Sequence, residues 1–269
     1  MKKYLALVLC VLMALTMFAG CGDASEETSA SAAPAERTTF TVGFDAEYPP
    51  FGYMDDDGSY TGFDLELAQA VCDMEGWEFV ATPIDWDAKD MELNSGSIDC
   101  IWNGFTINGR EDDYTWSVPY CDNSQVVVVK EGSDIKALAD LAGKTVGVQS
   151  ASAAESVLTD AEQQKELGDT FGAMNDFKDY NTAFAELEAG AIDALAVDIG
   201  VANYQLSSRE GFVILDESLN SEQYGVGFKL GNEELRDIIN ADLDALYADG
   251  TVTELAEKYD IADMICLGE

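Results

Sequence analysis

The chain has 269 residues, of which 47% are hydrophobic, and this is enough for two modest domains or one large one. Its 52 Asp and Glu residues outnumber 14 Lys and Arg residues, and it contains no His. This balance argues against nucleic acid and anionic membrane surfaces as partners, since both need basic patches, and it removes His-based catalysis and His metal ligands.

The N-terminus has the pattern of an export signal. Lys2 and Lys3 precede an apolar run over residues 4–18, and Ala19-Gly20-Cys21 follows. A basic start, a short apolar run and small residues predict a secretory signal peptide over residues 1–20. Cys21 after Ala-Gly resembles the bacterial lipoprotein box, although Phe18 stands where that motif usually has Leu. We therefore expect a lipid on Cys21 and a location outside the cytoplasm, on the cell membrane; the alternative is one uncleaved membrane helix, for which the run is short.

Residues 21–39 are predicted to be a lipidated, disordered tether, because they are mostly Ser, Ala, Glu and Thr. Cys72, Cys100, Cys121 and Cys266 remain in the mature protein, and an exported protein could pair them in three ways. Buried free thiols are an equal alternative, because Cys72 and Cys100 fall on apolar faces. The chain has no C-x-x-C spacing, so we predict no metal site.

Strands and helices alternate from residue 41 onward. In chain order, strands are predicted over residues 41–45, 77–81, 98–101, 125–129, 145–149, 193–197 and 224–230. Helices are predicted over residues 64–75, 88–94, 152–166, 182–189, 199–206, 233–247 and 251–259. This alternation is typical of an α/β fold with largely parallel sheets.

Two sequence patterns occur twice in the same order. The T-V-G of residues 41–43 returns at residues 145–147, and E-L-x-x-G-x-I-D over residues 92–99 returns over residues 186–193. Each longer pattern reads as a helix end, a Gly stop and a buried strand. The repeat predicts two similarly built lobes.

Polar residues follow several predicted strands, where open α/β sheets bind ligands. Asp45 and the Asn103–Thr106 turn end strands of the first lobe, and Gln149 and Asp198 end strands of the second. Arg110 and the small residues that open the helix after Gln149 suit a carboxylate, and the acids suit an ammonium. This is the charge pattern of a free amino acid. Taken alone, residues 98–110 also read as a strand, a turn and a surface Arg.

Two longer motifs connect the chain with a known family. Residues 62–68, GFDLELA, match G-[FY]-D-x-[DE]-L-[AL], and residues 45–51, DAEYPPF, match D-x-x-[YF]-x-P-F. From about residue 40 to residue 261 the chain resembles the type 3 bacterial solute-binding proteins, the amino-acid receptors of ABC importers. The resemblance implies two Rossmann-like lobes joined by a two-strand hinge, the type II periplasmic-binding-protein fold. Residues 40–124 and 225–269 would form lobe 1, and residues 125–224 would form lobe 2.

The resemblance also implies roles for individual residues. Tyr48 and Trp86 would sandwich the ligand side chain, Asp45 would contact its polar end, and Asp198 would accept the α-ammonium. The α-carboxylate would be bound by the turn and by lobe 2, through Asn103, Gly104, Thr106, Arg110, Gln149, Ser152 and Ala153. The alternatives are core aromatics, a surface acid at position 45 and a helix N-cap at position 198.

The chain departs from the family pattern in two places. The family spaces its Thr and Arg as T-I-T-x-E-R, whereas Thr106 and Arg110 stand one residue closer; Gly109 would let this turn tighten. Ala153 and Ala154 replace the usual Gly, Thr or Ser, which removes side-chain contacts and leaves backbone ones.

The implied function is that of a monomeric, lipid-anchored receptor that closes over one amino acid and delivers it to an ABC permease in the membrane, without a cofactor and without catalysis. One alternative is a prephenate or arogenate dehydratase on the same fold, but the lobe 2 helix start lacks the extra cation it would need. The other is a sensor domain, which would continue into a membrane span where this chain ends ten residues after Tyr259.

The charges near the expected ligand tip bear on its side chain. Asp45, Glu47, Asp85 and Asp87 lie there with Lys89 as the one accompanying cation. They favour a cationic or neutral polar ligand such as Arg, Lys, Gln or His over Asp or Glu.

Overall fold

The computed structural model describes residues 37–268. The predicted signal peptide, Cys21 and nearly all of the predicted tether lie outside these residues. The tether prediction extends one residue too far, because Thr39 already begins the first strand.

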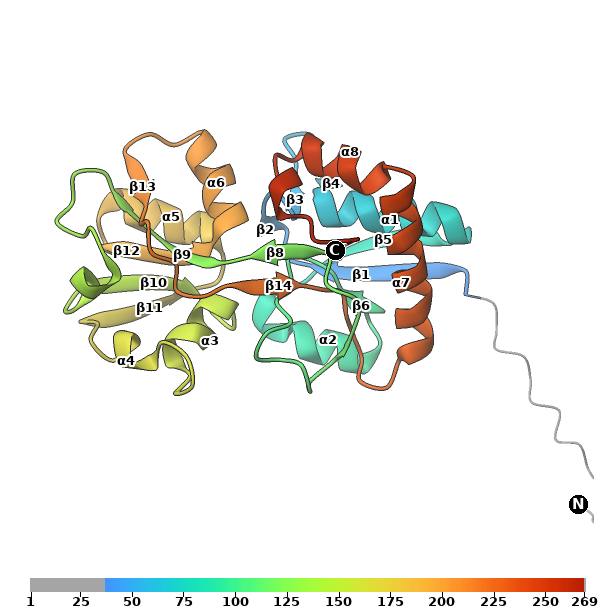
Figure 1. Ribbon diagram of the computed structural model, residues 1–269, viewed down its shortest axis with the longest axis horizontal. Coiled ribbons are helices and arrows are strands. Elements are labelled where there is room, and N and C mark those ends of the chain that lie inside the picture. The colour runs from blue at the N-terminus through green and yellow to red at the C-terminus, as the bar shows by residue number, and fades with distance from the viewer. Residues whose placement is uncertain (1–36, 269) are drawn as a thin grey trace, which may run out of the picture. The chain divides into compact units, whose positions relative to one another are not determined.

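Two five-stranded sheets organise the fold (Figure 1). The first has the order β5-β1-β6-β15-β7, with β1 at Thr39–Phe44, β5 at Glu78–Pro83, β6 at Cys100–Ile101, β7 at Thr115–Trp116 and β15 at Gly227–Phe228. The second has the order β11-β10-β12-β9-β13, with β9 at Gln125–Lys130, β10 at Thr145–Gln149, β11 at Ala173–Phe177, β12 at Ala194–Asp198 and β13 at Phe212–Ile214. Four strands of each sheet run in one direction and one strand, β15 or β9, runs opposite to them, as expected for largely parallel sheets.

Two strands cross between the sheets. β8 (Cys121–Asn123) and β14 (Glu222–Tyr224) pair antiparallel and run between the two groups of elements in Figure 1. The predicted fold of two lobes and a two-strand hinge is therefore confirmed, while the exact lobe boundaries stay a prediction. A small sheet of β2 (Glu47–Tyr48), β3 (Gly52–Met54) and β4 (Tyr60–Thr61) carries the loop that follows β1.

The helices follow the predicted pattern with one exception. They are α1 Phe63–Glu75, α2 Lys89–Ser95, α3 Ala153–Thr159, α4 Lys165–Gly168, α5 Tyr180–Ala189, α6 Ile199–Ser207, α7 Glu233–Ala248 and α8 Thr251–Lys258, with 3₁₀ turns η1 Trp86–Ala88, η2 Leu138–Leu141 and η3 Ala262–Met264. The single helix predicted over residues 152–166 is wrong, because it divides into α3 and α4. Asp160 adopts an extended conformation and its carboxylate accepts the Glu162 N–H at 2.9 Å, a local turn that competes with the helix.

The duplicated sequence patterns occupy equivalent positions in the two sheets. Val42 and Gly43 of β1 pair with Cys100 and Ile101, as Val146 and Gly147 of β10 pair with Ala194 and Leu195. The Asp of the longer pattern bonds the Thr of the T-V-G pattern in each lobe: Asp99 accepts the Thr41 N–H and Asp193 accepts the Thr145 N–H, both at 2.8 Å. The prediction of two similarly built lobes is confirmed at the level of individual hydrogen bonds.

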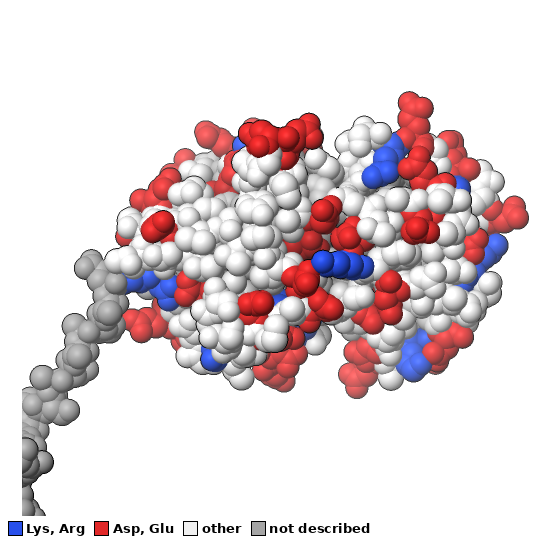
Figure 2. Space-filling model, turned by 180° about the vertical axis from the view of Figure 1, so that it is seen from behind, with Lys and Arg blue, Asp and Glu red and all other residues white. Residues whose placement is uncertain are grey.

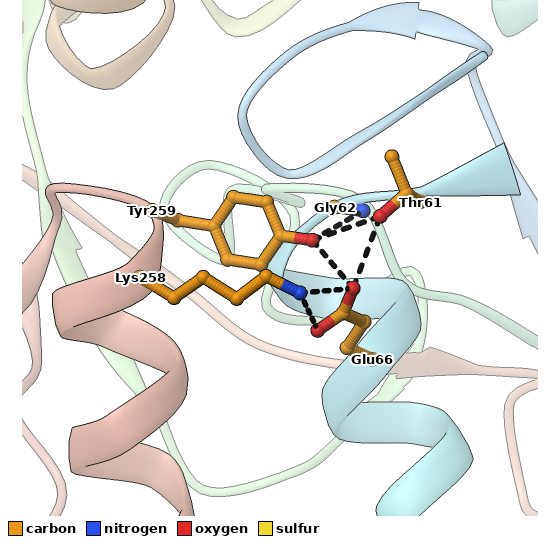
Figure 3. Close-up of polar contacts among 5 residues, drawn as sticks. All are labelled: Thr61, Gly62, Glu66, Lys258 and Tyr259. Carbon is orange, nitrogen blue, oxygen red and sulfur yellow. Dashed lines mark hydrogen bonds and ion pairs between the residues drawn. The ribbon is translucent and has the colours of Figure 1, made fainter. Parts of the chain in front are cut away.

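The GFD motif joins the start of α1 to the rest of the first lobe. Gly62 has φ 132, and a Cβ there would lie 2.3 Å from the Phe51 carbonyl oxygen, so no other residue fits. Tyr259 accepts the Gly62 N–H at 3.2 Å, and Glu66 of α1 binds Lys258 at the end of α8 (Figure 3). These contacts connect α8 and the residue that follows it to the GFD motif and fix the position of α1.

Cys72, Cys100 and Cys121 are buried free thiols, and burial raises the pKa of each. Of the two alternatives for these three residues, the structure shows the buried thiol. Over residues 37–268, no helix is long and apolar enough to cross a membrane.

Candidate functional site

A small cavity lies between the two sheets. Its lining consists of Tyr48, Trp86, Asn103, Gly104, Phe105, Thr106, Arg110, Gln149, Ser152, Ala153 and Asp198. All the predicted site residues except Asp45 are in this lining, and Phe105 is added. The open volume is about 10 Å³, which is room for roughly one water molecule. The cavity as it stands therefore has no room for a ligand larger than water.

Asp45 lies beside the cavity and closes it. It lines a wider groove of about 570 Å³ outside the cavity, and its Oδ2 accepts a hydrogen bond from Gln149 Nε2 at 2.6 Å. This bond joins the ends of β1 and β10, one from each lobe. Burial raises the pKa of Asp45 to about 6.

The Asn103–Thr106 turn is held from behind by the Asp64 of the GFD motif. Asp64 is fully buried, and its Oδ2 accepts the Gly104 N–H at 2.6 Å and the Tyr120 hydroxyl at 2.9 Å. Burial raises the pKa of Asp64 to about 7. Gly104 has φ 55, and a Cβ there would come within 2.9 Å of the Tyr48 ring. Glycine thus lets the turn pass directly behind the aromatic wall.

Arg110 reaches the cavity in spite of its shortened spacing. Gly109 adopts φ 81, and the Arg110 N–H bonds the Ile107 carbonyl at 2.9 Å, which tightens the turn as predicted. The guanidinium then stacks 5.3 Å from the Phe105 ring and donates to the carbonyls of Thr106 at 3.2 Å and Ala151 at 3.4 Å. The cation is therefore available inside the site.

Asp198 ends β12 at the opposite wall and is 3% exposed. Its Oδ1 accepts hydrogen bonds from Gln125 at 2.6 Å, Tyr224 at 2.6 Å and Asn123 at 2.8 Å. It stands at the N-cap position of α6, but its side chain makes no capping bond. Burial, followed by the nearby Glu222 carboxylate, raises the pKa of Asp198 to about 6.

Glu222 joins Thr106 to this acidic wall. Its Oε1 accepts from Thr106 Oγ1 at 2.8 Å, Asn123 at 2.7 Å and Gln125 at 2.8 Å. A hydroxyl that donates to a carboxylate presents its lone pairs to other groups. The Thr106 side chain therefore suits an ammonium better than the carboxylate predicted for it, and the predicted carboxylate contact of Thr106 would have to come from its backbone N–H.

Aromatic side chains form the remaining walls. The ring centroids of Tyr48 and Tyr180 are 5.9 Å apart, and the Tyr48 hydroxyl lies 3.4 Å from that of Tyr224. Trp86 meets Phe105 edge-on with ring centroids 5.4 Å apart. Flat apolar surfaces thus stand where the ligand side chain is expected.

Three of the acids expected near the end of the ligand side chain, Asp45, Glu47 and Asp85, line the groove outside the cavity. Asp85 forms an ion pair with Lys178 at 2.6 Å, and Glu47 accepts a hydrogen bond from Asn181, so each links the two lobes. Figure 2, which views the molecule from behind, shows acidic side chains outnumbering basic ones on that face.

The sequence reasoning missed four residues of the polar wall and misjudged Lys89. Asn123 lies on β8, Gln125 begins β9, and Glu222 and Tyr224 lie on β14. No period-2 alternation of polar and apolar residues marks these positions, because the three strands read CDN, QVVVVK and EQY. Lys89, counted among the charges near the tip, is buried beside Trp86.

Comparison with known proteins places this geometry in context. Residues 40–261 match the profile of the bacterial extracellular solute-binding proteins, family 3. The chain belongs to this family. It is 32% identical over 233 residues to the L-cystine-binding protein TcyJ of Escherichia coli (strain K12), covering 85% of each chain.

Solved structures agree with this family assignment. An ABC uptake transporter substrate-binding protein from Streptococcus pneumoniae, crystallised with bound histidine, has a TM-score of 0.79 and 34% identity over 84% of this chain and 94% of that one. An ancestral amino-acid-binding protein, described as a precursor of cyclohexadienyl dehydratase, has a TM-score of 0.75 and 31% identity over 82% of this chain and 95% of that one. This member of family 3 is thus similar to amino-acid-binding proteins along nearly all of the described chain.

Proposed function

We propose that this family 3 protein is the extracytoplasmic amino-acid-binding component of an ABC importer. The observation that carries the proposal is the polarity of the cavity, whose lining includes both the cation of Arg110 and the buried carboxyl of Asp198. With the lobes apart, a zwitterionic amino acid would bind between them, its α-carboxylate toward Arg110 and its α-ammonium toward Asp198. Tyr48 and Trp86 would cover its side chain.

Contacts between the lobes support a mechanism of closure over the ligand. Gln149 with Asp45, and Lys178 with Asp85, join the lobes at the edge of the cavity. When the lobes close, water leaves the site and each charged contact with the ligand strengthens. The open form would receive the amino acid, and the closed form would carry it to the permease as a monomer.

We expect the ligand to be a polar or cationic L-amino acid, because Asp45 adds a carboxylate at the mouth, where the ligand's side chain would end. A thermal-shift screen of all the common amino acids tests the proposal, since a ligand that binds only the folded state raises the melting temperature. We expect Arg, Lys, Gln or His to give the largest rise. No rise with any amino acid would contradict the function, and a preference for Glu or Asp would contradict the side-chain assignment.

We infer that the protein binds its ligand without chemistry, although one structural relative is a precursor of a dehydratase. A dehydratase needs an acid placed on the leaving hydroxyl. The buried acids of the wall, Asp198 and Glu222, are instead occupied by amide and hydroxyl donors. Incubation with prephenate or arogenate, followed by detection of the aromatic product, decides between the two activities.

We also propose that signal cleavage exposes Cys21 for lipid attachment, with residues 1–20 removed. Replacing Cys21 by Ser is expected to abolish incorporation of labelled palmitate and to release the protein from the membrane. Cys10→Ser, which changes a Cys inside the signal, is the matched control and should keep the label. Equal labelling of the Cys21→Ser variant and the wild type would contradict the lipid anchor.

A further inference from the structure

Lys89 is a buried cation at the edge of the cavity. It begins α2, is 5% exposed, and its ammonium lies 5.2 Å from the centre of the Trp86 ring. Within residues 37–268, Nζ donates to two backbone carbonyls alone, those of Trp86 at 3.4 Å and Ala151 at 3.3 Å. Both distances are long for a charged donor, which usually approaches an oxygen to about 2.7–2.9 Å.

Arg110 converges on the same carbonyl oxygen. Its Nη2 donates to Ala151 O at 3.4 Å, so Nη2 and the Lys89 Nζ are no more than 6.7 Å apart. Among the described residues, neither cation has a carboxylate oxygen within 4.0 Å. The nearby Glu155 carboxylate accepts the Ala151 N–H at 2.5 Å. Two cations, of which Lys89 is buried and Arg110 half-buried, therefore share one neutral oxygen, and a buried charge calls for a counter-charge.

We propose that Lys89 is a second carboxylate-binding residue, which holds the ligand's α-carboxylate together with Arg110. The inference rests on the proposed amino-acid function and deepens it. Trp86 and Arg110 both line the cavity. Lys89 lies against Trp86 and shares the Ala151 oxygen with Arg110, which would place its ammonium within reach of a carboxylate bound by Arg110. The carboxylate would replace weak contacts to carbonyls by charged hydrogen bonds.

This arrangement divides the site into two electrostatic ends. Lys89 and Arg110 form the cationic end against Ala151. Asp45 lies at the other end, bonded to Gln149. A ligand with its carboxylate at the first end can therefore still carry a cationic or polar side chain toward the second.

Proton uptake provides a signature of the contact. The pKa of Lys89 is lowered to about 8, mainly by burial and to a smaller extent by the positive charge of Arg110. The carboxylates of Asp87, Asp90 and Glu155 oppose this shift. At pH 8.5 the free protein therefore holds Lys89 largely neutral. A ligand carboxylate favours the charged form and raises this pKa, so binding takes up protons at pH 8.5 and far fewer at pH 6.5.

The experiment is calorimetry on the mature wild type, Lys89→Met and Lys89→Arg with the best amino acid from the thermal-shift screen and with its α-carboxamide. We expect Lys89→Met to weaken binding of the amino acid by about tenfold or more, to change the carboxamide's affinity less than about twofold, and to reduce proton uptake at pH 8.5. Lys89→Arg should retain most of the affinity. Lys178→Met, which removes the rim cation paired with Asp85, is the matched control and should treat amino acid and carboxamide alike.

Each result decides one of the proposals. Equal weakening of the amino acid and its carboxamide in Lys89→Met, or wild-type proton uptake in that variant, would overturn the role of Lys89 while leaving the function intact. A wild type that binds no amino acid would overturn both. Should Lys89→Met fail to fold, Lys89→Gln and the proton uptake of the wild type answer the same question.

Discussion

Replacing Asp198 by Asn is expected to weaken the binding of every amino acid by at least about 100-fold, which corresponds to roughly 2.7 kcal/mol, while the protein still folds. The change removes the negative charge that would face the ligand's α-ammonium. Asn keeps a carbonyl oxygen that can accept from Tyr224 or Gln125, which now donate to Asp198 at 2.6 Å each. The substitution also removes the repulsion between the carboxylates of Asp198 and Glu222, so the folded state loses little stability.

Titration calorimetry measures this effect, and a thermal melt without ligand confirms that the variant is folded. Asp193→Asn is the matched control, because Asp193 precedes the same strand and its exposed side chain accepts the Thr145 N–H at 2.8 Å, away from the cavity. That variant should bind as the wild type does. Affinity within about threefold of the wild type for Asp198→Asn would remove Asp198 from the binding site.

Replacing Asp64 by Ala is expected to destabilise the protein by about 2–4 kcal/mol, since the buried Gly104 N–H and Tyr120 hydroxyl both lose their acceptor. For a chain of this size the melting temperature would fall by roughly 5–15 °C. Asp64→Asn keeps an acceptor and should cost less. Asp73→Ala, on the exposed side of the same helix, should leave the melting temperature nearly unchanged. A melting temperature for Asp64→Ala equal to that of Asp73→Ala would show that the buried acid does not hold the turn.

The same acid makes stability depend on pH in a predictable direction. Its pKa is raised from 3.8 to about 7 in the folded protein, so between these values the folded state holds a proton that the unfolded state has lost. Stability should therefore fall as the pH rises from about 5 to 7, and Asp45 and Asp198, raised to about 6, act in the same direction. The dependence should be shallower in Asp64→Asn. Greater stability at pH 8 than at pH 5.5 would contradict this reasoning.

Local pattern accounts for most of the elements. Helical spacing and a Gly stop located α1 to within one residue at its start, and β10 matches its prediction in full. The helix and strand predictions that failed also have local explanations. α3 and α4 are separated by the Asp160 turn, and the strands β11 and β13 escaped prediction because most of their residues are not deeply buried, so apolar periodicity is weak.

The Asn103–Thr106 turn, which follows β6, shows what the sequence pattern alone leaves undecided. Its Gly and Thr were recognisable, but the side chain that holds it, Asp64, lies 40 residues away in sequence. Likewise the bond between Thr106 and Glu222 spans 116 positions. Hydrogen bonds between residues so distant in sequence leave no periodic signal, and they changed the expected role of the Thr106 hydroxyl.

By itself, the sequence determined the two-lobed α/β architecture, the family motifs and the polar strand ends that surround one cavity, because strand and helix periodicity and motif spacing are local properties of the chain. Only the tertiary structure decided which side chains are buried and what they face. It showed Lys89 buried next to Trp86 with its ammonium on the Ala151 carbonyl that Arg110 also contacts, Asp45 bonded to Gln149, and Asp198 within a network from both hinge strands. Burial and charge pairing arise where segments from the two lobes meet, and that meeting is a property of the folded chain as a whole.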